Sequence, residues 1–278
     1  MKNKYYSMLE KTQNAVDFIT AQTETKAKIG IILGSGLNAL AEDIEVKKTL
    51  LYADIPHFPV STVEGHEGKL LFGSIQNKEV IAMQGRFHYY EGYTMQEVTF
   101  PIRVMKALGV NVLILSNASG GMNPSYKVGD IVFITDHINF FPDNPLRGKN
   151  EDTLGVRFPD MSEVYSKELI SLAEQAAEVH GISYQKGVYV GVSGPTFETP
   201  AEYRMFRNMG GDCVGMSTVP EAIVARHAGM RCAAFSVITD LGVAGIVHKV
   251  SHHEVLKAAN EAEPKLRQLV REVVLRIG

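Results

Sequence analysis

The segment Lys28-Ile29-Gly30-Ile31-Ile32-Leu33-Gly34-Ser35-Gly36 decides the fold that we predict for this chain. Its apolar, β-branched run is typical of a buried strand, which should end at the glycines. A short helical pattern then begins at Leu37. Backbone N–H groups at such a strand-to-helix turn point at one spot and favour an anion, usually a phosphate. The turn alone leaves two interpretations equally open, a phosphate site that includes Ser35 or a turn without a ligand.

Length and composition exclude several classes of protein. The 278 residues suffice for one large α/β domain or two small ones. A net charge of −3 gives no basic excess for nucleic acid. There is no run of about 18 apolar residues that would span a membrane, and the polar N-terminus lacks the apolar core of a signal peptide. Cys213 and Cys232 are isolated, so we expect reduced, buried thiols in a cytoplasmic protein.

Strand and helix patterns alternate along the rest of the chain. Four capping boxes, which begin at Thr94, Thr199, Thr218 and Ser251, predict helix starts. The alternation predicts one α/β domain over residues 1–278, with a mixed central sheet flanked by helices and no linker. The predicted strands cover 28–34, 68–75, 78–84, 111–116, 130–135, 185–192, 212–216 and 231–239. The predicted helices cover 8–20, 94–109 and 163–180, and two follow the second and third capping boxes before the C-terminal helix.

Residues 139–161 form a long predicted loop rich in Pro, Asn, Asp and Gly. They show neither the helix nor the strand period. A loop of this length inside a compact domain is usually functional or lies at an interface.

Glycine and polar clusters end three of the predicted strands and lead toward helices. They are Gly34–Gly36, Asn117–Gly121 and Met216–Thr218. In open α/β sheets, ligands bind at the carboxyl ends of the strands, so we expect these clusters to share one crevice.

Arg86 and His88 follow the strand 78–84 and should reach the same crevice. The guanidinium of Arg86 offers a fork of donors that suits phosphate. A surface arginine or a core histidine is the commoner role for either residue alone. Together with Ser35 and Ser217, however, they predict a phosphate site.

Other motifs give weaker signals. Gly34-x-Gly36-x-x-Ala39 fits a loose dinucleotide fingerprint, but Asp54 does not close a clear second strand. There is no Gly-x-Ser-x-Gly elbow and no Walker loop. His248 and His252 have metal-like spacing but would not share a helix face, so a metal site is not favoured.

Six motifs give the chain its resemblance to a known family. It resembles trimeric purine nucleoside phosphorylase of the inosine/guanosine type over nearly its whole length. The motifs are Gly34-Ser35-Gly36-Leu37, Ser61-Thr62-Val63-x-Gly65-His66, Gly85-Arg86-Phe87-His88-x-Tyr90-Glu91-Gly92, Phe158-Pro159-x-Met161-Ser162, Gly194-Pro195-x-Phe197-Glu198-Thr199 and Gly215-Met216-Ser217-Thr218-Val219-Pro220-Glu221.

The resemblance implies a phosphorylase/hydrolase-like fold and a homotrimer that uses neither metal nor cofactor. It implies phosphorolysis, in which a purine nucleoside and phosphate give the free base and ribose 1-phosphate. Two other classes stay open, an oxidoreductase built on Gly34–Ala39 and a nucleoside-binding module without catalysis.

Site roles also follow from the resemblance, residue by residue. It implies His88, Glu198 and Asp240 as catalytic residues. The implied phosphate site contains Ser35, Arg86, His88, the backbone N–H of Ala118 and Ser217, with His66 as a second-rank candidate. The implied ribose site contains Tyr90, Met216, His252 and Phe158, the last supplied by a neighbouring subunit. The implied base site contains Phe197, Glu198, Val214, Thr239 and Asp240.

Asp240 departs from the family pattern, which usually has asparagine at this position. An asparagine would donate to O6 of a 6-oxopurine, whereas an ionised aspartate only accepts and would suit the amino group of adenine. The related methylthioadenosine phosphorylases resemble this chain in having aspartate there. Glu198 favours the opposite base, because a carboxylate prefers the N1–H of hypoxanthine or guanine. Two further alternatives are that Asp240 is protonated and that its side chain points away from the base.

Overall fold

The computed structural model describes residues 6–34, 38–62, 67–243 and 251–278. In these residues it contains nine strands and seven α-helices. The strands are β1 (Ile29–Leu33), β2 (Glu45–Leu51), β3 (Lys69–Ile75), β4 (Lys78–Gln84), β5 (Val112–Gly121), β6 (Ile131–Asn139), β7 (Tyr184–Gly191), β8 (Cys213–Gly215) and β9 (Arg231–Leu241). The helices are α1 (Met8–Thr20), α2 (Met95–Val98), α3 (Phe100–Ala107), α4 (Lys167–His180), α5 (Pro200–Asn208), α6 (Val219–His227) and α7 (His252–Arg276).

All nine described strands belong to one mixed sheet, in the order β2-β3-β4-β1-β5-β8-β7-β6-β9. β1 is parallel to β4 and β5, whereas β2, β3 and β4 are antiparallel neighbours. β9 pairs with β5 as well as with β6, so β5, β8, β7, β6 and β9 close into a ring. The predicted α/β fold with a mixed sheet is therefore confirmed.

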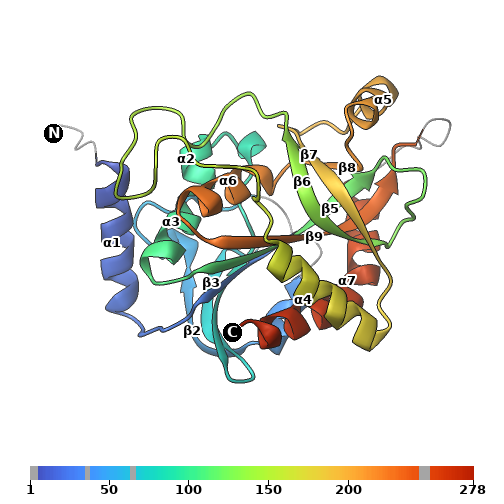
Figure 1. Cartoon of the computed structure of the whole chain (residues 1–278). Helices are drawn as coiled ribbons and strands as arrows, with labels where there is room; N and C mark the ends of the chain where they lie inside the picture. The colour runs from blue at the N-terminus through green and yellow to red at the C-terminus, as the bar shows by residue number, and fades with distance from the viewer. Residues whose placement is uncertain (1–5, 35–37, 63–66, 244–250) are drawn as a thin grey trace.

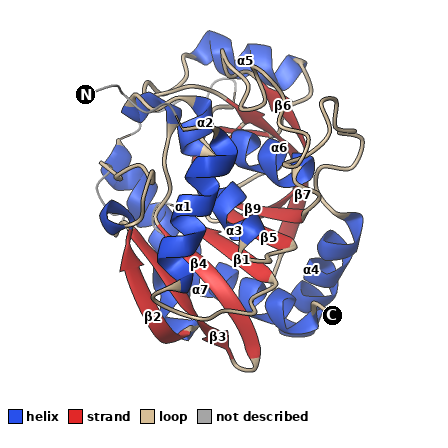
Figure 2. Ribbon diagram, turned by 90° about the vertical axis from the view of Figure 1, so that its left-hand side faces the viewer, coloured by secondary structure: helices blue, strands red, loops and turns tan. Residues whose placement is uncertain are grey.

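Helices cover the sheet on more than one side (Figure 1). α4 and α7 pack against each other and against β9. α1 packs on α3, α3 contacts α6, and α6 also contacts β9. Figure 2, turned by 90°, shows α1 in front of the sheet, with α5 near the top of the molecule.

The segment that decided the fold prediction forms a fully buried central strand. All five residues of β1 are buried between β4 and β5. A Cβ on Gly34, which follows β1, would lie 2.6 Å from the carbonyl oxygen of Ser116 on β5. Only glycine allows so close a backbone approach. The short helical pattern after it is a 3₁₀ helix at Asn38–Asp43.

One prediction about β5 was wrong. The strand extends to Gly121, so Asn117–Gly121 belongs to the sheet and does not lead into a capped helix. This cluster pairs with β9 on one side, and Gly120 and Gly121 pair with β8 on the other. Ser, Asn and Gly have low strand propensity, but pairing with two distant strands overrides it here.

Other predicted boundaries also differ from the structure. The predicted helix 94–109 is broken at Thr99, which is the C-cap of α2 and the N-cap of α3, with Pro101 in the first turn of α3. The helix predicted from Glu163 begins at Lys167, after the N-cap Ser166. β2 was not predicted, because its exposed residues give no buried period. All four predicted capping boxes are present at helix starts.

Candidate active site

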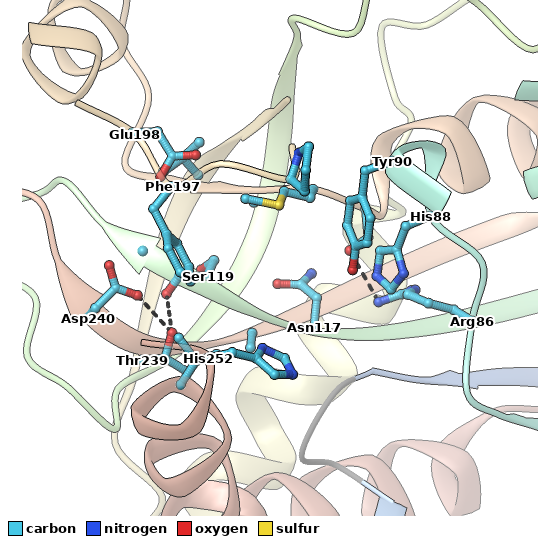
Figure 3. A pocket seen from close by; sticks show the side chains of 18 residues that line it. Arg86, His88, Tyr90, Asn117, Ser119, Phe197, Glu198, Thr239, Asp240 and His252 are labelled. Atoms are coloured by element: carbon cyan, nitrogen blue, oxygen red, sulfur yellow. Dashed lines mark hydrogen bonds between the residues drawn. The ribbon is translucent and has the colours of Figure 1, made fainter. Parts of the chain in front are cut away.

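A cavity of about 340 Å³ opens at the carboxyl ends of β5, β8 and β9. Its two ends differ in chemistry (Figure 3). Arg86, His88 and Tyr90 lie together at one end, whereas Glu198, Phe197 and Asp240 lie at the other. The cavity therefore has basic and phenolic side chains at one end and two carboxyl groups at the other.

Arg86 is buried in the cavity wall, with 1% of its surface exposed. Its Nε and Nη2 donate to the two carboxylate oxygens of Glu221 at 3.1 and 2.8 Å. Its Nη1 donates to the carbonyl oxygen of Ser116 at 2.6 Å and to Oγ of Ser217 at 3.3 Å. The sequence analysis assigned this fork of donors to phosphate, and that assignment stays a prediction. The fork engages Glu221, because a buried cation requires a counter-ion.

His88 is oriented by Glu91. Nδ1 of His88 lies 3.2 Å from a carboxylate oxygen of Glu91. A carboxylate only accepts, so Nδ1 carries the proton of the neutral ring. Burial raises the pKa of Glu91, but hydrogen bonds from His88 and Thr62 outweigh it and lower the pKa to about 2. Burial also lowers the pKa of His88, so the ring is neutral near pH 7.

A buried network fixes the turn between β8 and α6. Thr218 is fully buried and has a φ of +65°, which is a strained value for a β-branched residue. Nδ2 of Asn117 donates to Oγ1 of Thr218 at 2.9 Å, and the backbone N–H of Thr218 donates to Glu221 at 3.1 Å. Oγ of Ser236 donates to Oδ1 of Asn117 at 2.6 Å. The turn that presents Ser217 to the cavity is therefore held from two sides.

Asp240 is oriented by its neighbours at the acidic end. Oγ1 of Thr239 donates to Oδ1 of Asp240 at 2.9 Å, and the Tyr203 hydroxyl donates to Oδ2 at 3.2 Å. Burial raises the pKa of Asp240 and raises that of Glu198 to about 7. Each carboxyl therefore resists ionisation, and the Asp240 charge adds to the shift of Glu198.

The structure brings most of the predicted site residues together. The cavity is lined by Arg86, His88, Tyr90, Ala118, Phe197, Glu198, Val214, Met216, Ser217, Thr239, Asp240 and His252. Ser35 and His66 lie outside the described residues. Phe158 does not line the cavity of the single chain, and 87% of its surface is exposed.

Tyr203 and Glu221 were not predicted to act in the site, and Asn117 and Ser119 were expected there only as part of the Asn117–Gly121 cluster. Asn117 and Ser119 line the cavity, and Glu221 and Tyr203 bond to residues that do. Glu221 had a signal, since it is the acid of the third capping box, but a cap does not reveal an ion pair with an arginine 135 residues away.

The comparisons with known proteins agree with this geometry. The sequence profile of the phosphorylase superfamily matches residues 28–275. Purine nucleoside phosphorylase 1 of Bacillus subtilis (strain 168) is 53% identical over 96% of this chain and 98% of its own length. This chain belongs to the purine nucleoside phosphorylase family.

Solved structures of related phosphorylases have the same fold. A schistosoma purine nucleoside phosphorylase in complex with hypoxanthine has a TM-score of 0.93 at 41% identity, covering 99% of this phosphorylase and 100% of that chain. The Schistosoma mansoni enzyme in complex with adenosine has a TM-score of 0.92 at 42% identity, covering 97% of this chain and 98% of that one.

The described part of this phosphorylase has neither a cluster of side chains that suits a metal ion nor a helix that suits a membrane. Its described residues include no group of three or more His, Cys, Asp or Glu side chains placed to hold a metal ion. Among its described helices, none is both long and apolar enough to span a membrane.

Proposed function

We propose that this enzyme catalyses the phosphorolysis of purine ribonucleosides and deoxyribonucleosides, chiefly inosine and guanosine and also adenosine. The observation that carries the proposal is the two-ended cavity, with Arg86, His88 and Ser217 at one end and Glu198 with Asp240 at the other. The two substrates of phosphorolysis would bind in a matching order. The phosphate anion lies next to the sugar of the nucleoside, and the base lies beyond the sugar. The names of the relatives support the same reaction.

Phosphate is assigned to the end that contains Arg86. Ser35, Arg86, His88, the backbone of Ala118 and Ser217 would hold it, with His66 in second rank. The Glu221 carboxylate offsets part of the Arg86 charge, so hydroxyl and N–H donors supply the rest of the attraction. With Nδ1 protonated toward Glu91, Nε2 of the neutral His88 ring would accept a hydrogen bond from a protonated phosphate oxygen.

The sugar is assigned to the middle of the cavity, where Tyr90, Met216 and His252 line the wall. We propose that Phe158 of a neighbouring subunit completes this part in a homotrimer. The transition state should resemble an oxocarbenium ion at C1′. The bound phosphate stabilises that positive charge and then forms the new C–O bond as the base leaves.

The base is assigned to the acidic end, beside Phe197 and Val214. The leaving purine gathers negative charge, and hydrogen bonds from a preorganised site stabilise it. A protonated Asp240 would donate to the purine, and Thr239 holds its carboxyl in place. Catalysis then depends on positioning and electrostatics, without a covalent enzyme intermediate and without a cofactor.

Adenosine is included because of Asp240. Where the family usually has an amide, this chain has a carboxyl that can accept from an exocyclic amino group. The adenosine complex of the Schistosoma mansoni relative shows that a member of this fold can hold a 6-aminopurine nucleoside. We also propose a cytoplasmic location, in keeping with the buried free thiols of Cys213 and Cys232.

The test is the release of purine from inosine, guanosine and adenosine with and without phosphate. We expect release of the base that requires phosphate, with ribose 1-phosphate formed in equal amount. Release without phosphate would indicate a hydrolase, and binding without turnover would indicate a binding module. A fluorescence titration with NADH tests the oxidoreductase alternative, and we expect no binding.

A further inference from the structure

A second cavity, of about 80 Å³, lies apart from the active site and shares no lining residue with it. Its walls come mainly from α2, α3 and the last turn of α6, which lie side by side in Figure 1, and from the loop segment 145–154. A water molecule takes about 30 Å³ in the liquid, so this cavity has room for a small ion and not for a nucleoside.

Arg103 of α3 supplies a buried positive charge to this cavity. Only 8% of its surface is exposed, and burial lowers its pKa to about 10, so the guanidinium stays charged near pH 7. Within the described residues Arg103 makes no ion pair, and its one hydrogen bond joins Nη1 to Nδ1 of His227 at 3.2 Å. Nε and Nη2 of Arg103 therefore have no partner in the part of the chain that the structure describes.

His227 cannot neutralise this charge. An arginine only donates, so Nδ1 of His227 is the accepting nitrogen and Nε2 carries the proton of a neutral ring. Nε2 is buried and has no hydrogen-bond partner among the described residues. α6 ends at His227 and adds a partial negative charge there, but Arg103 donates to no carbonyl oxygen of the described helix. The buried cation therefore lacks a full counter-charge.

The other charged side chains of the cavity lining are Arg147, Lys149 and Glu151. Arg147 pairs with Asp143 at 3.5 Å, whereas Lys149 makes no ion pair within the described residues. Lys149 and Glu151 are exposed, so water and salt screen their charges more than that of the buried Arg103. The lining therefore has an excess of positive charge that is centred on Arg103.

We propose that this cavity binds one small oxyanion of the size of inorganic phosphate, with Arg103 as its main ligand and Lys149 at the rim. A buried cation without a counter-ion is costly, and an oxyanion on Nε and Nη2 would remove that cost. The planar guanidinium fork matches two oxygens of such an ion. The inference goes beyond the proposed reaction, because no catalytic step is assigned to this cavity.

The loop wall of the cavity is held in place by its own contacts. Nε2 of Gln96 donates to the carbonyl oxygen of Arg147 at 3.1 Å, and Nδ2 of Asn150 donates to that of Gly155 at 2.9 Å. A Cβ on Gly155 would lie 2.2 Å from the carbonyl oxygen of His227, so the loop approaches the end of α6 as closely as glycine permits. A site that is formed in advance binds an ion without the cost of ordering a loop.

The test is the number of phosphate ions bound per chain, measured by equilibrium dialysis of the wild type and of Arg103→Met. We expect two in the wild type, one in each cavity. In Arg103→Met the affinity of the second cavity should fall at least about a hundredfold, because two charge-assisted hydrogen bonds are lost, and one ion should remain. Arg103→Lys keeps the charge without the fork, so its second ion should bind about tenfold more weakly than in the wild type.

Arg231→Met is the matched control. Nη1 of Arg231 donates to both carboxylate oxygens of Glu168 at 2.7 Å, and Arg231 lines neither cavity. We expect it to bind two phosphate ions, as the wild type does. Crystals soaked in tungstate, a tetrahedral oxyanion that anomalous scattering locates, should show the ion on Arg103 in the wild type and in Arg231→Met only.

Lys149→Ala keeps the inference testable if Arg103→Met does not fold. Lys149 is exposed at the rim, so this variant should fold and should bind the second ion about threefold more weakly. Four results would overturn the inference: one phosphate in the wild type, a second phosphate that persists in Arg103→Met, an unchanged second affinity in Lys149→Ala, or an acidic side chain of a neighbouring subunit on Arg103 in the crystal. A wild type that binds two phosphate ions but releases no purine supports the inference and contradicts the proposed function.

Discussion

Arg86 and Glu221 form a buried ion pair at the phosphate end of the cavity. Arg86→Ala should raise the KM for phosphate at least about tenfold and that for inosine much less. It should also lower the free energy of unfolding by about 3–5 kcal/mol, because Glu221 stays buried without a counter-ion. Steady-state kinetics and urea unfolding measure the two effects.

Arg147→Ala is the control for this prediction. The Arg147 side chain is 79% exposed and pairs with Asp143 at 3.5 Å. An exposed pair of this kind contributes little stability, so we expect both KM values and the unfolding free energy to stay near the wild type. If Arg86→Ala instead raised the KM for inosine and left that for phosphate unchanged, Arg86 would not belong to the phosphate end.

At the same scale, sequence reasoning found the residues that follow strand ends. Arg86, His88 and Ser217 were expected in one crevice by this rule, and the structure brings them into one cavity. The sequence analysis did not identify the side chains that form hydrogen bonds to the site residues from outside the cavity. The hydrogen bond between Tyr203 and Asp240 spans 37 residues, and no local pattern in the sequence indicates it. Pairings of this kind depend on the folded sheet, which brings distant residues together.

At the scale of an element, the start of α7 connects helix capping to the site. Oγ of Ser251 accepts from the backbone N–H of Glu254 at 3.3 Å, and His252 and Val255 of the same turn line the cavity. Ser251→Ala should lower the free energy of unfolding by about 1 kcal/mol. It should also raise the KM for inosine several-fold, because His252 loses its fixed position.

Ser7→Ala provides a matched comparison. Ser7 and Glu10 form the same capping box at the start of α1, far from the cavity lining. We expect a similar loss of stability, measured by thermal unfolding, without a change in KM. Equal kinetic effects of the two substitutions would show that the cap of α7 does not position the site.

The four helix starts predicted from capping boxes depended on local chemistry, and this explains why they were right. A capping box is complete within four residues, so the sequence contains all of it. The extent of β5 and the existence of β2 depend on pairing with strands far away in sequence. Neither feature has a local signal, since β2 is mostly exposed and the end of β5 is rich in residues typical of loops.

At the scale of the whole molecule, Phe158 is exposed in the long loop between β6 and α4. We expect it to complete the ribose site of a neighbour in a homotrimer. Phe158→Ala should then raise the KM for inosine about tenfold without loss of fold. Sedimentation velocity of the wild type should show a trimer. An active monomer, or an unchanged KM, would contradict this arrangement.

Val179→Ala is the control for surface truncation. Val179 is 71% exposed on α4, and no role in the site is assigned to it. We expect unchanged kinetics and the same sedimentation as the wild type.

The closed ring of β5, β8, β7, β6 and β9 has a consequence for how the protein resists aggregation. Strands recruit foreign strands through open sheet edges, and closure removes those edges. Strands β1, β4, β3 and β2 extend the sheet outward from β5 of the ring. β2 is the last of these described strands, so one of its edges is open. β2 carries Glu45, Lys47 and Lys48. Charged side chains at an edge oppose its pairing with a strand of another molecule, which is the first step of fibril formation. We therefore expect this edge not to cause aggregation in a concentrated solution.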